Sequence, residues 1–126
     1  MVDIKQTKFH KVFPAELKRD TLIVAPGGDA VSCRDSDINK ELNTLQQLID
    51  QPEVTNLIVD LGSSDYFGSI IIGAINNMGM KAKDAGGRIA ICEASTDMMG
   101  ILRVMNLDTI WSHYDTKKEA IRAFKN

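Results

Sequence analysis

Long apolar runs are missing from this chain of 126 residues. No apolar stretch approaches the roughly 20 residues that a membrane-spanning helix needs. Because residues 1–5, MVDIK, are also polar and charged, we expect no membrane insertion, no export and a cytoplasmic protein. The formal net charge of −2 shows neither the basic footprint of a nucleic-acid-binding protein nor an acidic tail. We therefore expect no nucleic-acid partner.

Cysteine is scarce too. Cys33 and Cys92 are far apart and show neither a C-x-x-C spacing nor a disulfide-rich pattern. A chain of this length buries a core without disulfides or a structural metal. No repeat, linker or low-complexity segment divides it, so we expect a single domain over residues 1–126 with two ordinary, reduced cysteines.

The common catalytic motifs are absent as well. The sequence contains no G-x-x-x-x-G-K-[ST], G-x-G-x-x-G or G-x-S-x-G, and His10 and His113 have no metal-ligand spacing. Asp20, Asp60 and Asp65 stand near predicted strand ends, where aspartates commonly hold turns through their side chains. We therefore predict no catalytic residue, cofactor or metal. The alternative is an enzyme that uses Asp60 or Asp65 in phosphate chemistry.

What the sequence does contain is an alternation of strand and helix patterns. The predicted strands are residues 9–13, 20–25, 57–59, 88–92 and 109–111, and the predicted helices are residues 35–50, 70–85, 95–105 and 115–124. Strands separated by single helices imply parallel pairing with right-handed crossovers. The first two strands would instead pair as a hairpin across residues 15–19. The prediction is an α/β fold with a mostly parallel central sheet, an N-terminal antiparallel pair and about four covering helices.

The chain is organised around residues 54–73, VTNLIVDLGSSDYFGSIIIG. A β-branched apolar run over residues 57–59 predicts a buried strand, and Asp60 should hold the turn that follows it. Ser69 directly precedes an apolar stripe at helical spacing, which predicts that Ser69 is the N-cap of a helix. The unpaired amides and the dipole at a helix start favour an anion, including a phosphate carried on Ser69 itself.

Several segments carry a resemblance to a known family. They are residues 57–61, 66–69, 86–91, 101–108 and 119–121. With them the chain resembles a STAS domain from its second predicted strand to its last helix. This family comprises bacterial anti-sigma-factor antagonists and also supplies cytoplasmic domains to anion transporters.

The resemblance implies a modification site. In the family, the loop after the central strand leads to an Asp-Ser-[Ser/Thr]-Gly signature whose first hydroxyl residue is phosphorylated by a cognate anti-sigma kinase. Ser69 matches that residue, so the resemblance implies phosphorylation of Ser69. Gly68 stands in place of the aspartate, Ile70 in place of the second hydroxyl residue and Ile71 in place of the glycine. These differences remove a carboxylate beside the acceptor and add bulk.

The resemblance also implies a role. The chain would be a regulatory interaction module in a partner-switching pathway that controls transcription, and its partner would be an anti-sigma factor or a serine kinase. The alternative within the family is an unphosphorylated scaffold or a transporter-associated subunit, and a homodimer stays open. Independently of the resemblance, Ile70 and Ile72 flank the core-facing stripe of the predicted helix, so at least one of them should face solvent. The predicted partner-binding residues are Gly62, Ser63, Ser64, Asp65, Tyr66, Phe67, Gly68, Ser69, Ile70, Ile72 and Gly73.

Overall fold

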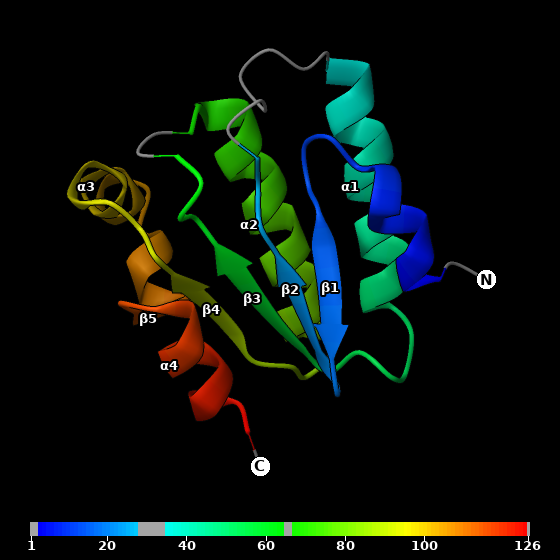
Figure 1. Cartoon of the computed structure of the whole chain (residues 1–126). Coiled ribbons are helices and arrows are strands. Elements are labelled where there is room, and N and C mark those ends of the chain that lie inside the picture. Colours follow the sequence, from blue (N-terminus) through cyan, green and yellow to red (C-terminus); the bar gives the residue numbers. More distant parts are fainter. Residues whose placement is uncertain (1–2, 28–34, 65–66, 126) are drawn as a thin grey trace.

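The computed structural model describes residues 3–27, 35–64 and 67–125. In this part of the chain a five-stranded sheet has the order β1-β2-β3-β4-β5 (Figure 1). The strands are β1 (Ala15–Lys18), β2 (Thr21–Val24), β3 (Asn56–Asp60), β4 (Ile89–Cys92) and β5 (Ser112–Tyr114). β1 is antiparallel to β2, and every other neighbouring pair is parallel. The predicted fold class is confirmed.

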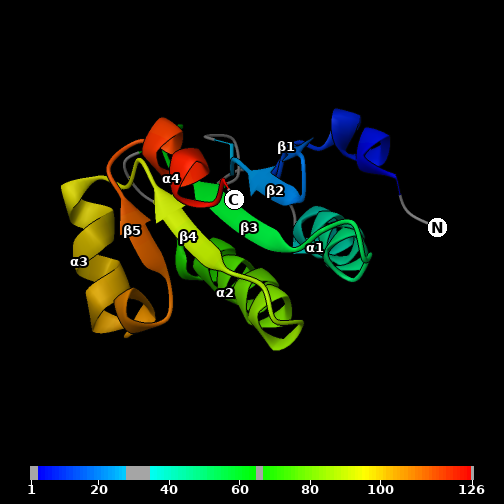
Figure 2. The ribbon, with the colours of Figure 1, turned by 90° about the horizontal axis from the view of Figure 1, so that it is seen from below.

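Four α-helices and two short 3₁₀ helices accompany the sheet in the described residues. They are η1 (Ile4–Phe9), α1 (Asp35–Ile49), α2 (Ser69–Asp84), α3 (Thr96–Val104), η3 (Leu107–Thr109) and α4 (Lys117–Ala123). Figure 2 shows α1 and α2 on one face of the sheet, α4 on the other, and α3 beside the β5 edge. The predicted number of covering helices is confirmed.

The side chains of β2, β3 and β4 alternate between two apolar cores. The larger core takes Leu22, Val24, Leu57, Val59, Ile89 and Ile91 and lies against α1, α2 and α3. The smaller core takes Ile23, Ile58, Ala90 and Cys92 and lies against Ala120 and Phe124 at α4. Because both faces are covered, these strands are apolar along their whole length, as buried parallel strands are.

The predicted strand over residues 9–13 is wrong. Only residue 9 of this range is regular: it ends η1, which a capping box of Asp3 and Gln6 begins, with the Asp3 amide donating to Gln6 Oε1 at 2.7 Å. Residues 10–14 are irregular. After η1, the Glu41 carboxylate of α1 accepts the amide protons of Lys11, Val12 and Phe13 at 2.9 to 3.0 Å. These amides are therefore satisfied by a helix side chain and have no need of a strand partner.

The first hairpin consequently lies further along the chain than predicted. Residues 15–18, which were expected to form its loop, are β1, and Ala15 pairs with Val24 while Lys18 pairs with Thr21. The connection is a turn of only two residues, Arg19 and Asp20. The tight turn has none of the usual Asn-Gly or Asp-Gly signals, so the sequence pattern did not reveal it.

The predicted strand over residues 109–111 is also wrong. Asn106 has a left-handed backbone (φ 60°), and the amides of Ile110 and Trp111 both donate to the Leu107 carbonyl, which closes η3. Trp111 is 2 % exposed and packs against Gly79 of α2. The apolar dipeptide at residues 110–111 therefore anchors the chain in the larger core, and β5 begins one residue later.

Side-chain caps begin two of the helices. Ser95 Oγ accepts the Met98 amide, and Thr116 Oγ1 accepts the Glu119 amide, each at 3.1 Å. Gly86, just past α2, takes the positive φ expected of a glycine at a helix end (91°). α1 begins at residue 35, directly after residues that lie outside the described ranges.

We predict that Gly79→Ala destabilises the protein by about 1–3 kcal/mol, because a methyl group there would overlap the Trp111 indole. Gly73→Ala in the same helix is the matched control, since a Cβ at residue 73 would meet nothing within 4 Å. That control should stabilise the protein by about 0.5–1 kcal/mol. Urea unfolding of both variants measures the difference, and equal stabilities would show that α2 and Trp111 are loosely packed.

Candidate functional site

The candidate site is the loop that joins the end of β3 to the start of α2. β2, β3 and β4 are parallel, so their carboxyl ends lie together along one side of the sheet, across the ends of the strands. Open α/β sheets commonly bind ligands there. The loop runs from Leu61 to Gly68 on this side (Figure 1). Two of the predicted partner-binding residues, Asp65 and Tyr66, lie outside the described residues.

Asp60 holds the first turn of this loop, as predicted. Its Oδ1 accepts the Gly62 amide at 2.9 Å, and the Leu61 amide donates to the Cys92 carbonyl at 3.0 Å. A Cβ on Gly62 would lie 3.0 Å from Asp60 Oδ1 and 3.1 Å from the Cβ of Glu93. Gly62 thus has a steric role in this turn, because almost any side chain would displace one of these neighbours.

Two further contacts hold the loop from other parts of the chain. The Ser63 hydroxyl donates to the Pro26 carbonyl after β2, and the Phe67 amide donates to Met98 Sδ of α3 at 3.4 Å. Pro26 and Met98 carry no sequence signal for this role. In the sequence, the proline indicates only the end of a strand, and the methionine is one member of the apolar stripe of its helix. Three separate segments therefore position the described part of the loop.

Ser69 is the first residue of α2, and its predicted role as N-cap is wrong. Gly68 occupies the N-cap position with an extended backbone (φ −73°, ψ 171°), and it has no side chain to cap the helix. The Ile72 amide makes the first helical bond, to the Gly68 carbonyl at 3.0 Å. Ser69 is exposed on the first turn, where helix amides have no partner within the helix.

The three isoleucines after Ser69 point in different directions. Ile70 is 57 % exposed, whereas Ile71 and Ile72 are 4 % and 2 % exposed and belong to the larger core. The expectation that at least one of Ile70 and Ile72 faces solvent is confirmed by Ile70. Ile71, which stands at the glycine of the family signature, contributes to packing.

The predicted partner-binding surface needs a correction. Phe67 is 1 % exposed and Ile72 is 2 % exposed, so neither side chain is available to a partner. The loop turns Phe67 inward to cover the core, and helical spacing turns Ile72 inward with it. Gly62, Ser63, Ser69 and Ile70 are exposed, while Ser64, Gly68 and Gly73 are half-buried.

A charged cluster lies at the same end of the strands, on the side of α4. Lys117 Nζ lies 2.8 Å from Glu16 Oε1, and the Lys117 amide donates to Glu93 Oε2 at 2.9 Å. The hydrogen bond to Glu16 raises the pKa of Lys117, and it lowers the pKa of Glu16. Burial, together with the charges of Asp60 and Glu93, raises the pKa of the Cys92 thiol to about 12. The thiol is therefore neutral at physiological pH, and Cys33 lies outside the described residues.

The two histidines lie in separate places. His10 Nδ1 is 3.0 Å from the Phe13 carbonyl and 3.4 Å from Glu41 Oε1. His113 lies in β5, where burial lowers its pKa. Within the described residues no group of three His, Cys, Asp or Glu side chains could hold a metal ion. Asp20 precedes β2 and Asp60 ends β3, so these two carboxylates lie at opposite ends of the parallel strands and share no site.

We predict that Asp60→Ala costs about 1 kcal/mol of unfolding free energy, because the variant loses the acceptor for the Gly62 amide. Asp60→Asn keeps an acceptor oxygen at that position and should cost less. Chemical denaturation of both variants measures the order. If Asn proved as costly as Ala, the negative charge of Asp60 would matter more than its hydrogen bond.

Comparisons with known proteins agree with this architecture. A sequence model of the STAS domain matches residues 15–120. An anti-sigma-factor antagonist (STAS) domain protein from Planctomyces limnophilus is 20 % identical, with a TM-score of 0.73 over 88 % of this chain and 96 % of that one. A putative anti-sigma factor antagonist from Thermotoga maritima is 20 % identical, with a TM-score of 0.74 over 93 % and 97 %.

A third similar structure is that of the Bacillus cell fate determinant SpoIIAA in its phosphorylated form. It is 19 % identical, with a TM-score of 0.69 over 90 % of this chain and 99 % of that one. At these identities the structures show a shared fold. A search of the curated proteins found no match, and none of the described helices has the length and apolarity to cross a bilayer. Since the sequence model spans residues 15–120, the chain belongs to the STAS domain family.

Proposed function

We propose that this chain is a regulatory binding module of the anti-sigma-factor-antagonist type, controlled by phosphorylation of Ser69. Its partner is an anti-sigma factor or a serine kinase of a cytoplasmic partner-switching pathway. The chain acts as one domain, by binding and without catalysis of its own. The partner surface consists of the exposed residues of the loop and the first turn of α2, namely Gly62, Ser63, Ser69 and Ile70.

The observation that carries this proposal is the position of Ser69. It is exposed on the first turn of a 16-residue helix, so a kinase could reach its hydroxyl without unfolding the domain. A phosphate there would add about −1.5 to −2 charges at neutral pH. The helix dipole and the amides of the first turn favour such an anion. The modification would therefore leave the fold intact and change the surface.

The neighbouring side chain suggests how that surface is used. Ile70 exposes 57 % of its area beside Ser69, on a first turn that follows the positioned loop. Apolar area that the fold leaves uncovered favours a partner that buries it. A phosphate on Ser69 would oppose docking, because the partner would have to bury a charge next to that apolar contact.

One observation favours the second candidate, a scaffold that is never phosphorylated. A Cβ on Gly68 would meet nothing within 4 Å, and the backbone there is of the extended kind that any residue adopts. The aspartate of the family signature would therefore fit at residue 68, and packing does not explain its replacement. Loss of that carboxylate is the change expected if selection for a phosphorylation site were relaxed.

We predict that phosphorylated protein binds the partner at least about tenfold more weakly than unmodified protein. Ser69→Asp should show a smaller loss, since a carboxylate carries less charge than a phosphate. Ser69→Ala should bind normally, and its stability should change by no more than about 0.5 kcal/mol, because Ser69 caps nothing. The partner is first identified by pull-down with the full chain, and calorimetric titration then compares the four forms.

The same samples separate the two candidates. Incubation with the co-purifying kinase and ATP, followed by peptide mapping, should place the phosphate on Ser69. Phosphate found only on Ser63 or Ser64 would move the modification into the loop. Equal affinity of all four forms would favour the scaffold.

We also predict that Ile70→Ser weakens partner binding about tenfold or more without loss of stability, because the side chain is exposed in the unbound protein. Met80→Ser is the matched control: Met80 is 37 % exposed near the other end of α2 and should leave binding unchanged. Binding that survives Ile70→Ser but fails with Met80→Ser would move the interface away from the first turn.

A further inference from the structure

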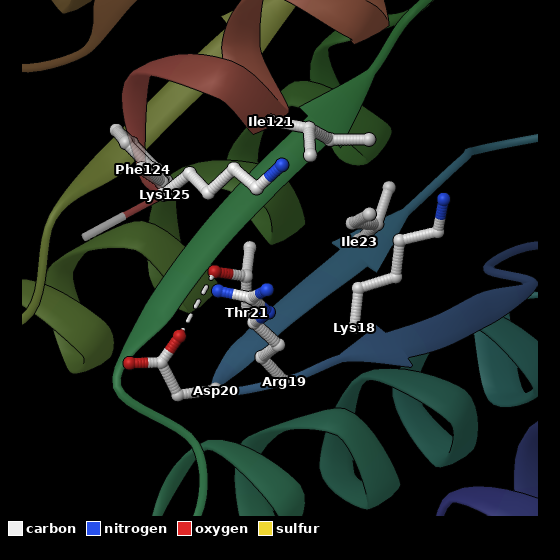
Figure 3. Close-up of a pocket in the computed structure, with 8 residues that line it drawn as sticks. All are labelled: Lys18, Arg19, Asp20, Thr21, Ile23, Ile121, Phe124 and Lys125. Atoms are coloured by element: carbon white, nitrogen blue, oxygen red, sulfur yellow. Dashed lines mark hydrogen bonds between the residues drawn. The ribbon is translucent and has the colours of Figure 1, made fainter.

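A concave site lies at the amino ends of the parallel strands, opposite to the end that carries Ser69. It is a pocket of about 380 Å³ between the β1–β2 hairpin and the end of α4 (Figure 3). Its lining residues are Lys18, Arg19, Asp20, Thr21, Ile23, Ile121, Phe124 and Lys125. The volume lies in the range of about 300–1,000 Å³ that small-molecule sites occupy. None of these residues belongs to the site proposed above.

The apolar part of the pocket is firmly built. Ile23 and Phe124 belong to the smaller core and are 2 % and 7 % exposed. The Phe124 ring is held by Tyr114, edge to face at 6.5 Å between centroids, and by the Arg88 guanidinium at 4.6 Å from its centroid. Arg88 Nη1 also donates to the Ala123 carbonyl at 3.3 Å. The aromatic ring therefore has a fixed orientation before any ligand arrives.

The polar part of the pocket is cationic. Lys18 and Arg19 come from the hairpin and Lys125 from the end of α4, so positive charges lie on both sides of it. Asp20 is the single acidic lining residue, and its Oδ1 accepts the Thr21 hydroxyl at 3.4 Å. The whole chain has a net charge of −2, so this pocket reverses the sign of the protein's charge. A reversal of this kind attracts an anion.

Arg19 also has an unfavourable backbone. Its φ of 56° lies in the left-handed region, in a two-residue turn where glycine or asparagine is usual. The tight turn itself requires this conformation, and a charged residue that adopts it is uncommon. The turn directs the guanidinium toward the Thr21 side of the pocket (Figure 3).

We propose that this pocket binds a small organic anion, with an aromatic or other apolar body against Ile23, Ile121 and Phe124. Its phosphate, sulfonate or carboxylate group lies between Arg19 and the two lysines. The pocket lies at the amino ends of the parallel strands, whereas Ser69 follows their carboxyl ends. The ligand therefore binds independently of the partner surface.

The test uses 8-anilinonaphthalene-1-sulfonate as an anionic aromatic probe and N-phenyl-1-naphthylamine as its neutral counterpart. Methyl NMR titration should shift Ile23 and Ile121, with the anionic probe bound about tenfold more tightly than the neutral one. The double variant Lys18→Gln/Lys125→Gln should remove most of that difference. The double variant Lys5→Gln/Lys83→Gln, in which both lysines are exposed and away from the pocket, is the matched control and should bind like wild type.

Arg19→Asn gives a second, independent result. Asparagine tolerates the left-handed backbone, so this variant should keep or raise the thermal midpoint while losing affinity for the anionic probe about threefold or more. Affinity that is unchanged in both Arg19→Asn and the lysine double variant would overturn the proposal, as would shifts confined to another part of the sheet. Partner binding by these variants should be unaltered, so either proposal fails without the other.

Discussion

The alternation of side chains along β2, β3 and β4 is the constraint on which the rest of the structure depends. Each of these strands sends successive residues into opposite cores, so the sheet needs cover on both faces. The cover is unequal. Two long helices and α3 enclose the larger core, while α4, with seven residues, covers the smaller one. The shortness of α4 leaves room for the pocket beside the β1–β2 hairpin.

The common direction of these strands separates the two proposed sites. Their carboxyl ends carry the loop that Asp60, Pro26 and Met98 position, followed by Ser69. Their amino ends carry the tight turn of Arg19 and Asp20 beside the end of α4. The two proposed sites therefore lie at opposite ends of the parallel strands, with the buried sheet between them.

The three residues that differ from the family signature, Gly68, Ile70 and Ile71, have different structural roles. Ile71 lies in the larger core, so its bulk there contributes to stability. Ile70 lies on the surface, where its bulk has little effect on packing and adds apolar area that is open to solvent. Gly68 has room for a larger residue, so neither packing nor backbone conformation requires glycine. Of the three differences, therefore, only the one at Ile71 is taken up by the core.

The sequence by itself determined the strands β2, β3 and β4, the approximate extents of the four helices and the turn held by Asp60. Apolar runs, helical periodicity and local side-chain caps depend on residues that are close in the sequence, so the sequence pattern predicts them. Tertiary structure alone decided where the two outer strands, β1 and β5, begin and end. Residues 9–13 have the pattern of a strand, but Glu41, which is distant in the sequence, accepts the amide protons of residues 11–13. Residues 109–111 also have the pattern of a strand, but Trp111 packs against Gly79 of α2. Tertiary structure likewise decided that Phe67 and Ile72 turn inward and that Arg19, Phe124 and Lys125 meet, because each of these outcomes depends on contacts between distant segments.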